Sequence, residues 1–362
     1  MKHLLVCLSL FFVMGSGPEA KDLKKAQELQ KQNRSHAALA EFDKAIRADP
    51  KDATAYNGRG NANLDLGNLD KAIADFNEAI RLKPDYAAAY YDRGIVYGSH
   101  QGKVDQAIAD FDQAIRIKPD YTGAYFDRAS MYIQQGKFQK ALADYNQVIR
   151  IHPNMAIAYY GRGNVYLSLL GKLGKAIADF NQAIRLKPDL AIAYYSRGHV
   201  YEDQGKLDQA LADYDRVIRL QPNNADAYAS RANVYANQKG KADQVIANLS
   251  QIIRLKPDDV TVYSVRGSKY AQLGKPEKAL ADFNQVIRMQ PDNAQAYFNR
   301  GLAHAELNKL SEAIADFSQM IRLQPKNGLG YFLRGKAYGQ NGENSKAEAD
   351  FAKAKQLGYK PD

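Results

Sequence analysis

The feature that most constrains this chain is a proline that recurs at a nearly constant spacing. Nine prolines are separated from one another by 34 or 35 residues, at positions 50, 84, 119, 153, 188, 222, 257, 291 and 325. A period of this length is typical of a small structural unit repeated in tandem. Because a repeat array is one continuous body, we do not expect the 362 residues to form separate globular domains.

The residues between the prolines predict two helices in each unit. When the proline is numbered 32, position 4 is tyrosine in all nine units, from Tyr56 to Tyr331, and position 8 is always Gly or Ala. Position 20 is usually Ala, as at Ala176, and an aromatic residue usually follows four residues later, as at Phe180. Apolar residues spaced three and four apart mark two amphipathic helices, divided by a glycine-containing turn. Small residues let these helices approach closely, and the proline ends the second one.

This pattern resembles the tetratricopeptide repeat family from about residue 19 to residue 358. The chain departs from the family pattern with Tyr instead of Trp at position 4 and Arg instead of Leu at position 7. The resemblance implies an all-α fold, a right-handed α-solenoid superhelix of about ten helix–turn–helix units. We expect a degenerate first unit at 19–52, nine tandem units at 53–358 and a short C-terminal tail at 359–362.

The N-terminal segment predicts export. Lys2 precedes a largely apolar run from Leu4 to Met14, and small residues follow at 15–17. This is the layout of a signal peptide, here residues 1–17, and the run is too short to span a membrane as a helix. If the segment is cleaved, the mature protein is periplasmic or secreted. Cys7 is the only cysteine, so a mature chain would contain neither disulfides nor a cysteine-based metal site.

Two complementary charged columns predict a structural ladder. Position 7 is arginine and position 23 is aspartate in nearly every unit. An arginine that replaces a core leucine needs a partner when it is buried, so we interpret the columns as ion pairs that hold helix to helix, with anion binding by the arginines as the alternative. The ladder residues are Arg93, Asp110, Arg128, Asp144, Arg162, Asp179, Arg197 and Asp213.

The first helices carry the candidate ligand-binding residues. By resemblance to the family, positions 2, 5, 9, 12 and 13 line a concave groove, and position 5 is aromatic in six of nine units. Aromatic rings flanked by amides suit an extended peptide, because rings grip side chains and amides bond the main chain. The same rings could instead only pack adjacent helices together. The candidate groove residues are Tyr91, Phe126, Tyr160, Asn164, Tyr195, His199, Asn233, Phe298 and Phe332.

The sequence favours a non-catalytic protein-interaction scaffold. The six histidines are scattered, and no nucleophile elbow, phosphate loop or metal-spaced cluster is evident. We therefore expect no enzyme activity, no cofactor, no metal and no small-molecule substrate, with a peptide or protein as the partner. The alternative is a self-associating component of an envelope or secretion-related assembly. The net charge of +10 is spread evenly, so nucleic acid is not an expected partner, although an anionic polymer would be a third option.

Overall fold

The computed structural model describes residues 18–32, 34–100, 102–169 and 172–360 of the chain. Within these residues the chain forms helices α1 to α20 and one short π-helix, η1, with no strand. The predicted all-α fold of tandem helix–turn–helix units is therefore confirmed. The predicted signal peptide, residues 1–17, lies outside the described residues.

The chain divides into two compact blocks, Met1–Ala193 and Tyr194–Asp362, and each is described by itself. The N-terminal block contains α1 (Pro18–Lys31), α2 (Ser35–Ala48), α3 (Ala53–Asp65), α4 (Leu69–Leu82), α5 (Ala87–Ile95), η1 (Val96–His100), α6 (Val104–Ile117), α7 (Thr122–Gln134), α8 (Phe138–Ile151), α9 (Ala156–Ser168) and α10 (Leu173–Leu186).

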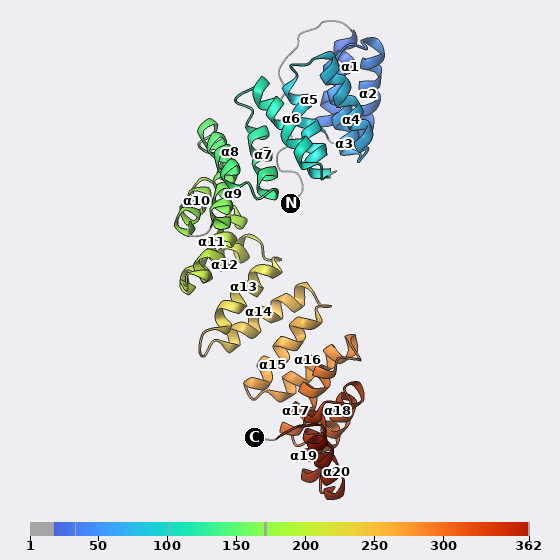
Figure 1. Cartoon of the computed structure of the whole chain (residues 1–362), viewed down its shortest axis with the longest axis vertical. Coiled ribbons are helices and arrows are strands. Elements are labelled where there is room, and N and C mark those ends of the chain that lie inside the picture. The colour runs from blue at the N-terminus through green and yellow to red at the C-terminus, as the bar shows by residue number, and fades with distance from the viewer. Residues whose placement is uncertain (1–17, 33, 101, 170–171, 361–362) are drawn as a thin grey trace. The chain divides into compact units, whose positions relative to one another are not determined.

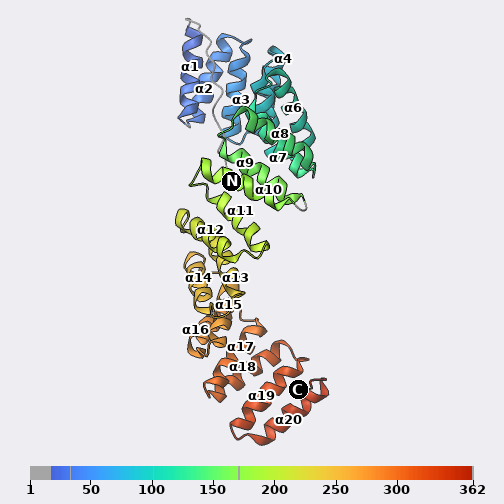
Figure 2. The same cartoon turned by 90° about the vertical axis from the view of Figure 1, so that its left-hand side faces the viewer.

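The C-terminal block contains most of α11 (Ala191–Asp203) and all the helices that follow it. These helices are α12 (Leu207–Leu220), α13 (Ala225–Ala236), α14 (Ala242–Leu255), α15 (Val260–Gln272), α16 (Pro276–Met289), α17 (Ala294–Glu306), α18 (Leu310–Leu323), α19 (Gly328–Gln340) and α20 (Asn344–Gln356). In both blocks, consecutive helices pair as the first and second helix of a unit, as Figure 1 and Figure 2 show for α3 with α4 and α19 with α20.

The small residue at position 8 is required by the close approach of the two helices. A Cβ atom added to Gly163 on α9 would lie 2.7 Å from Cε1 of Phe180 on α10. Phe180 itself is fully buried. The ring at position 24 therefore fills the space that the missing side chain leaves, and a larger residue at position 8 would displace it.

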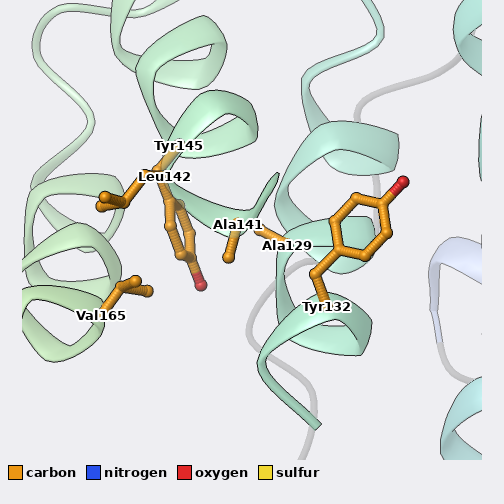
Figure 3. Close-up of a cluster of buried hydrophobic side chains, with 6 residues drawn as sticks. All are labelled: Ala129, Tyr132, Ala141, Leu142, Tyr145 and Val165. Carbon is orange, nitrogen blue, oxygen red and sulfur yellow. The ribbon is translucent and has the colours of Figure 1, made fainter. Parts of the chain in front are cut away.

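The same packing continues from one unit to the next. Figure 3 shows Tyr145 of α8 beside Leu142 and Val165 on one side and Ala141 on the other. Val165 belongs to α9, the first helix of the following unit, so this cluster joins two units. Because every unit shares its apolar surface with its neighbours, the core runs continuously within a block.

Turns and helix ends follow from local backbone chemistry. Gly136, between α7 and α8, has a φ of +68°, a left-handed conformation that glycine adopts without steric cost. Between α5 and α6, where the unit has 35 residues instead of 34, the first helix continues as the π-helix η1, which takes up the extra residue. In the described part of the chain, no helix is both long enough and apolar enough to cross a lipid bilayer.

Candidate functional site

The structure brings the predicted Arg–Asp ladder residues together in pairs. Each of the four predicted arginines places Nη2 against Oδ1 of an aspartate on the second helix of its own unit. The distances are 2.7 Å for Arg93–Asp110, 2.6 Å for Arg128–Asp144, 2.7 Å for Arg162–Asp179 and 2.6 Å for Arg197–Asp213. The four aspartates are buried, and in each pair Nε donates a second hydrogen bond to the carboxylate.

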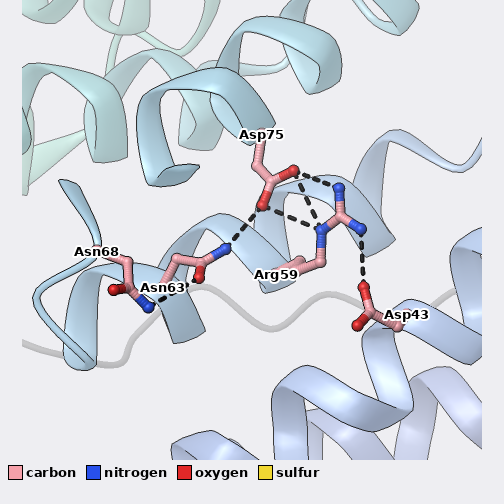
Figure 4. Close-up of polar contacts among 5 residues, drawn as sticks. All are labelled: Asp43, Arg59, Asn63, Asn68 and Asp75. Atoms are coloured by element: carbon pink, nitrogen blue, oxygen red, sulfur yellow. Dashed lines mark hydrogen bonds and ion pairs between the residues drawn. The ribbon is translucent and has the colours of Figure 1, made fainter. Parts of the chain in front are cut away.

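Three arginines of the ladder, Arg93, Arg128 and Arg162, also contact the preceding unit, which the sequence analysis missed. Arg93 Nη1 donates to Asn77 Oδ1 at 2.6 Å, and Arg162 Nη1 donates to Asn146 Oδ1 at 2.7 Å. Figure 4 shows the same arrangement at Arg59, which contacts Asp75 of its own unit and Asp43 of the unit before it. Position 25, which supplies this partner, is Asp, Asn or Ser in every unit except the last, where it is Ala. This column of short, mostly polar side chains is the sequence feature that could have predicted the contact.

Tyrosines at positions 4 and 11 complete the environment of the ladder arginines. The guanidinium carbon of Arg93 lies 5.6 Å from the ring centre of Tyr90 and 5.9 Å from that of Tyr97. Hydrogen bonding to Asp110 raises the pKa of Arg93 above its ordinary value. Because the cation is held by two polar partners and two rings, its donors are used within the protein. This geometry supports a structural function for the arginine column.

The predicted aromatic residues of the first helices are all half-buried. One side of each of four rings packs against the ring at position 24 of its own unit, at centre distances of 5.8 Å for Tyr91–Phe111, 5.5 Å for Phe126–Tyr145, 6.0 Å for Tyr160–Phe180 and 5.8 Å for Phe332–Phe351. Phe298 is half-buried as well. These rings therefore take part in helix packing and still expose part of their surface.

Tyr195 and His199 lie together in a polar cluster on α11. Their rings are 4.5 Å apart, and His199 Nδ1 lies 3.1 Å from the hydroxyl of Tyr214, which donates to Glu202 Oε2 at 2.6 Å. The two predicted asparagines differ in their surroundings. Asn164 is half-buried and Asn233 is exposed, and neither side chain hydrogen-bonds to any described residue.

Within a block, contacts between successive first helices define a surface, the first-helix face, made by positions 5, 6 and 9. Asn57 at position 5 and Asn61 at position 9, both on α3, donate from Nδ2 to Oδ2 of Asp92 at position 6 of α5, at 2.9 and 2.8 Å. Tyr91 at position 5 donates its hydroxyl to Oδ2 of Asp127 at position 6 of α7, at 2.7 Å. The predicted groove did not include position 6, yet the aspartates at this position contact residues at the predicted positions 5 and 9.

The C-terminal block exposes apolar side chains on the first-helix face of its own helices. Val265 at position 6 of α15 is 43% exposed, and Leu302 at position 9 of α17 is 39% exposed. Sequence reasoning did not select these two residues, because their exposure depends on the neighbouring helices. Among the described residues, no group of three or more His, Cys, Asp or Glu side chains is arranged to hold a metal ion.

Comparisons with solved structures find the same fold. A tetratricopeptide repeat protein from Parabacteroides merdae is 22% identical, covers 69% of this chain and 98% of its own, and gives a TM-score of 0.50. The C-terminal part of a TPR repeat-containing protein from Cytophaga hutchinsonii is 20% identical, covers 66% of this chain and 97% of its own, and gives 0.54. YrrB, described as a TPR protein with an unusual peptide-binding site, is 25% identical, covers 52% of this chain and 97% of its own, and gives 0.45.

Family comparison covers most of the chain. The tetratricopeptide repeat description matches residues 23–87, 64–122, 265–328 and 330–357. The TPR repeat description matches residues 129–169, 169–205 and 198–239. A comparison with curated proteins found no significant match. The repeat geometry and these matches agree, and the chain belongs to the tetratricopeptide repeat family.

Proposed function

We propose that this protein is a non-catalytic scaffold that binds a peptide or protein partner on its first-helix face. Proteins of the tetratricopeptide repeat family generally mediate protein–protein interactions. The observation that carries the proposal here is the exposure of Val265 and Leu302 on that face. A partner that covers these two side chains would remove their apolar surface from water, which favours binding.

Polar groups on the same face support a peptide partner. The side chains of Asn164 and Asn233 make no hydrogen bond to the described residues, so their amides can bond to a main chain. The half-buried rings at position 5 offer apolar surface beside them. Within the C-terminal block, the combination of Phe298, Asn233 and the exposed aliphatic residues suits an extended segment.

A matched pair of leucines tests this proposal. Peptides would be selected from a displayed library on the immobilised protein, and their affinities measured by fluorescence anisotropy. Leu302→Ser should weaken binding at least fivefold, since the residue lies on the first-helix face. Leu273→Ser is the control, because Leu273 is 38% exposed but follows α15 in the turn to the next helix. Equal effects of the two substitutions, or no effect of either, would contradict the proposal.

A second candidate function, self-association, is favoured by one residue on the last helix. Phe351 at position 24 of α20 is 38% exposed, whereas the equivalent Phe317 on α18 is 1% exposed. In the earlier units, an aromatic ring at position 24 is covered by the unit that follows it. Light scattering of the wild type and of Phe351→Ser separates the candidates, because a monomer in both samples would remove self-association.

We also propose that the protein acts outside the cytoplasm, on the basis of the apolar segment from Leu4 to Met14. Mass spectrometry of the protein purified from its native host would test this. Loss of residues 1–17, or of a segment ending close to residue 17, is the expected result. An intact N-terminus in a cytoplasmic fraction would contradict it.

A further inference from the structure

Two aspartates on the first-helix face lack the cationic partner that the ladder aspartates have. Among the described residues, Asp92 accepts side-chain hydrogen bonds only from the neutral amides of Asn57 and Asn61. Within the same part of the chain, Asp127 accepts one only from the neutral hydroxyl of Tyr91. Neither forms an ion pair with a Lys, Arg or His of the described residues, although both are half-buried. By contrast, every ladder aspartate from Asp110 to Asp213 pairs with an arginine.

An ionised carboxylate in this setting is costly to the folded protein. Burial raises the pKa of Asp92 to about 6, and burial raises the pKa of Asp127 to about 6 as well. Neutral donors offset only part of the lost hydration of a charged group. A cation from another molecule would offset the rest of this lost hydration.

The unused acceptor of Asp92 points to the same kind of ligand. Both amides donate to Oδ2 of Asp92, so its Oδ1 accepts no hydrogen bond from the described residues. A lysine ammonium or arginine guanidinium donates several hydrogen bonds and accepts none, so it suits this remaining acceptor.

The charge of the whole chain makes this acidic site a local exception. The net charge is +10, so long-range electrostatics should attract anions rather than cations. Binding of a basic peptide would therefore have to arise from particular carboxylates and not from the overall field.

We propose that Asp92 and Asp127 bind lysine or arginine side chains of the peptide partner. The inference rests on the proposed function, in which the first-helix face takes a peptide, and it adds the chemical class of that peptide. The two aspartates belong to successive first helices, α5 and α7, and packed helices lie about 10 Å apart. Three residues of a polyproline II helix span about the same length and return to the same side.

This spacing selects the probe. The test peptide is a fluorescent, amidated Ala-Pro-Lys repeat of four copies, which places a lysine on one side at every third residue. The comparison peptides carry acetyllysine or glutamate at the lysine positions. We expect the lysine peptide to bind the full-length protein at least tenfold more tightly than either comparison peptide, against the sign of the net charge.

Substitutions then assign the binding to the two carboxylates. Asp92→Asn keeps an acceptor for Asn57 and Asn61 and removes only the charge. It should weaken binding of the lysine peptide at least fivefold. Asp127→Asn should act in the same direction. Asp85→Asn is the control for charge, because Asp85 is exposed in the turn before α5, and it should change the affinity less than twofold. Circular dichroism of each variant establishes that the fold is retained.

Several results would overturn the inference while leaving the proposed function intact. These are equal affinity for the acetyllysine peptide, an unchanged affinity in Asp92→Asn, or equal losses in Asp92→Asn and Asp85→Asn. Absence of saturable lysine-peptide binding at millimolar concentration would overturn it too. The proposed function fails separately, through the Leu302→Ser and Leu273→Ser comparison in the other block.

Discussion

The hydroxyl of Tyr91 donates a 2.7 Å hydrogen bond to Oδ2 of Asp127, from the first helix of one unit to the first helix of the next. Hydrogen bonds to charged acceptors contribute more to folding stability than hydrogen bonds to neutral acceptors. Tyr91→Phe should therefore lower the free energy of unfolding by about 2 kcal/mol at pH 7.5, and by less at pH 5, where Asp127 is protonated. Urea denaturation at the two pH values measures this.

Tyr160→Phe is the matched control for that substitution. Tyr160 occupies the same position of another unit, and its hydroxyl makes no hydrogen bond to the described residues. Its removal should change the unfolding free energy by less than about 0.5 kcal/mol. Equal losses in the two variants would show that the hydrogen bond to Asp127 contributes nothing measurable.

Asp92→Asn should stabilise the protein at neutral pH. Burial raises the pKa of Asp92 to about 6, so the folded state holds a proton that the unfolded state releases near pH 4. Stability therefore falls as pH rises from about 4 to 6, and the cost persists above pH 6. The neutral amide avoids this cost, so we expect a gain of about 1–2 kcal/mol at pH 7.5 and little gain at pH 4. A gain of equal size at both pH values would contradict the linkage.

Binding of the basic peptide should depend on pH in the opposite sense. Above pH 6 the carboxylates are charged and bind the lysine side chains, whereas protonation below pH 6 removes the attraction. The tyrosines Tyr86, Tyr91 and Tyr145 interact electrostatically with Asp92 or Asp127, and burial raises the pKa of each, so none of them changes charge in this range. Affinity measured by anisotropy should fall about tenfold from pH 7.5 to pH 5. An unchanged affinity would argue against Asp92 and Asp127 as the ligands.

Asn248→Asp should restore a missing pair of the ladder. Asn248 is buried and accepts one hydrogen bond from Arg231 Nε at 2.9 Å, where the other units offer a carboxylate with two acceptors. A charged, two-point contact should raise the free energy of unfolding by about 1 kcal/mol. The same substitution at exposed Asn233 is the control and should have little effect. A loss of stability in Asn248→Asp would mean that burial of the new charge outweighs the pair.

Gly163→Ala and Gly174→Ala should change stability in opposite directions. The new methyl group at 163 would lie 2.7 Å from the Phe180 ring, whereas at 174 nothing lies within 4 Å. We expect a loss of about 1–3 kcal/mol at 163 from overpacking, and a gain of up to about 1 kcal/mol at 174 from the better helix propensity of alanine. Thermal unfolding of the two variants measures both. A stabilised Gly163→Ala would show that Phe180 moves aside at no cost.

The fold could be predicted from the sequence because the same residue types recur at the packing positions of each unit. Gly163 and Phe180 stand in columns, and the contact between them is made again in other units. The pairs of Arg93 with Asp110 and of Arg162 with Asp179 were predictable for the same reason, since opposite charges recur at a fixed separation. The second partner of each arginine varies among Asp, Asn and Ser, and this variation hid its common function.

The first-helix face was less predictable, because function there rests on residues that do not recur. Asp92 and Asp127 are aspartates in a column that elsewhere holds Gly, Ser, Asn, Val and Leu, so no pattern singles them out. What distinguishes them is that no cationic side chain of the described residues pairs with them, and a linear sequence does not show this. The exposure of Val265 likewise depends on which helix lies beside it.

The arginine contacts that join each unit to the one before it also determine how the array comes apart. Since each unit is tied only to its neighbours, its unfolding obeys a nearest-neighbour chain, in which the free energy of each junction sets cooperativity. Arg231 forms an ion pair with Asp215 of the preceding unit, but its partner inside its own unit is the amide of Asn248 instead of a carboxylate. The weakened contact therefore lies within the unit, between α13 and α14. Within the C-terminal block, we expect these two helices to separate more readily than the helices of a unit whose Arg–Asp pair is complete.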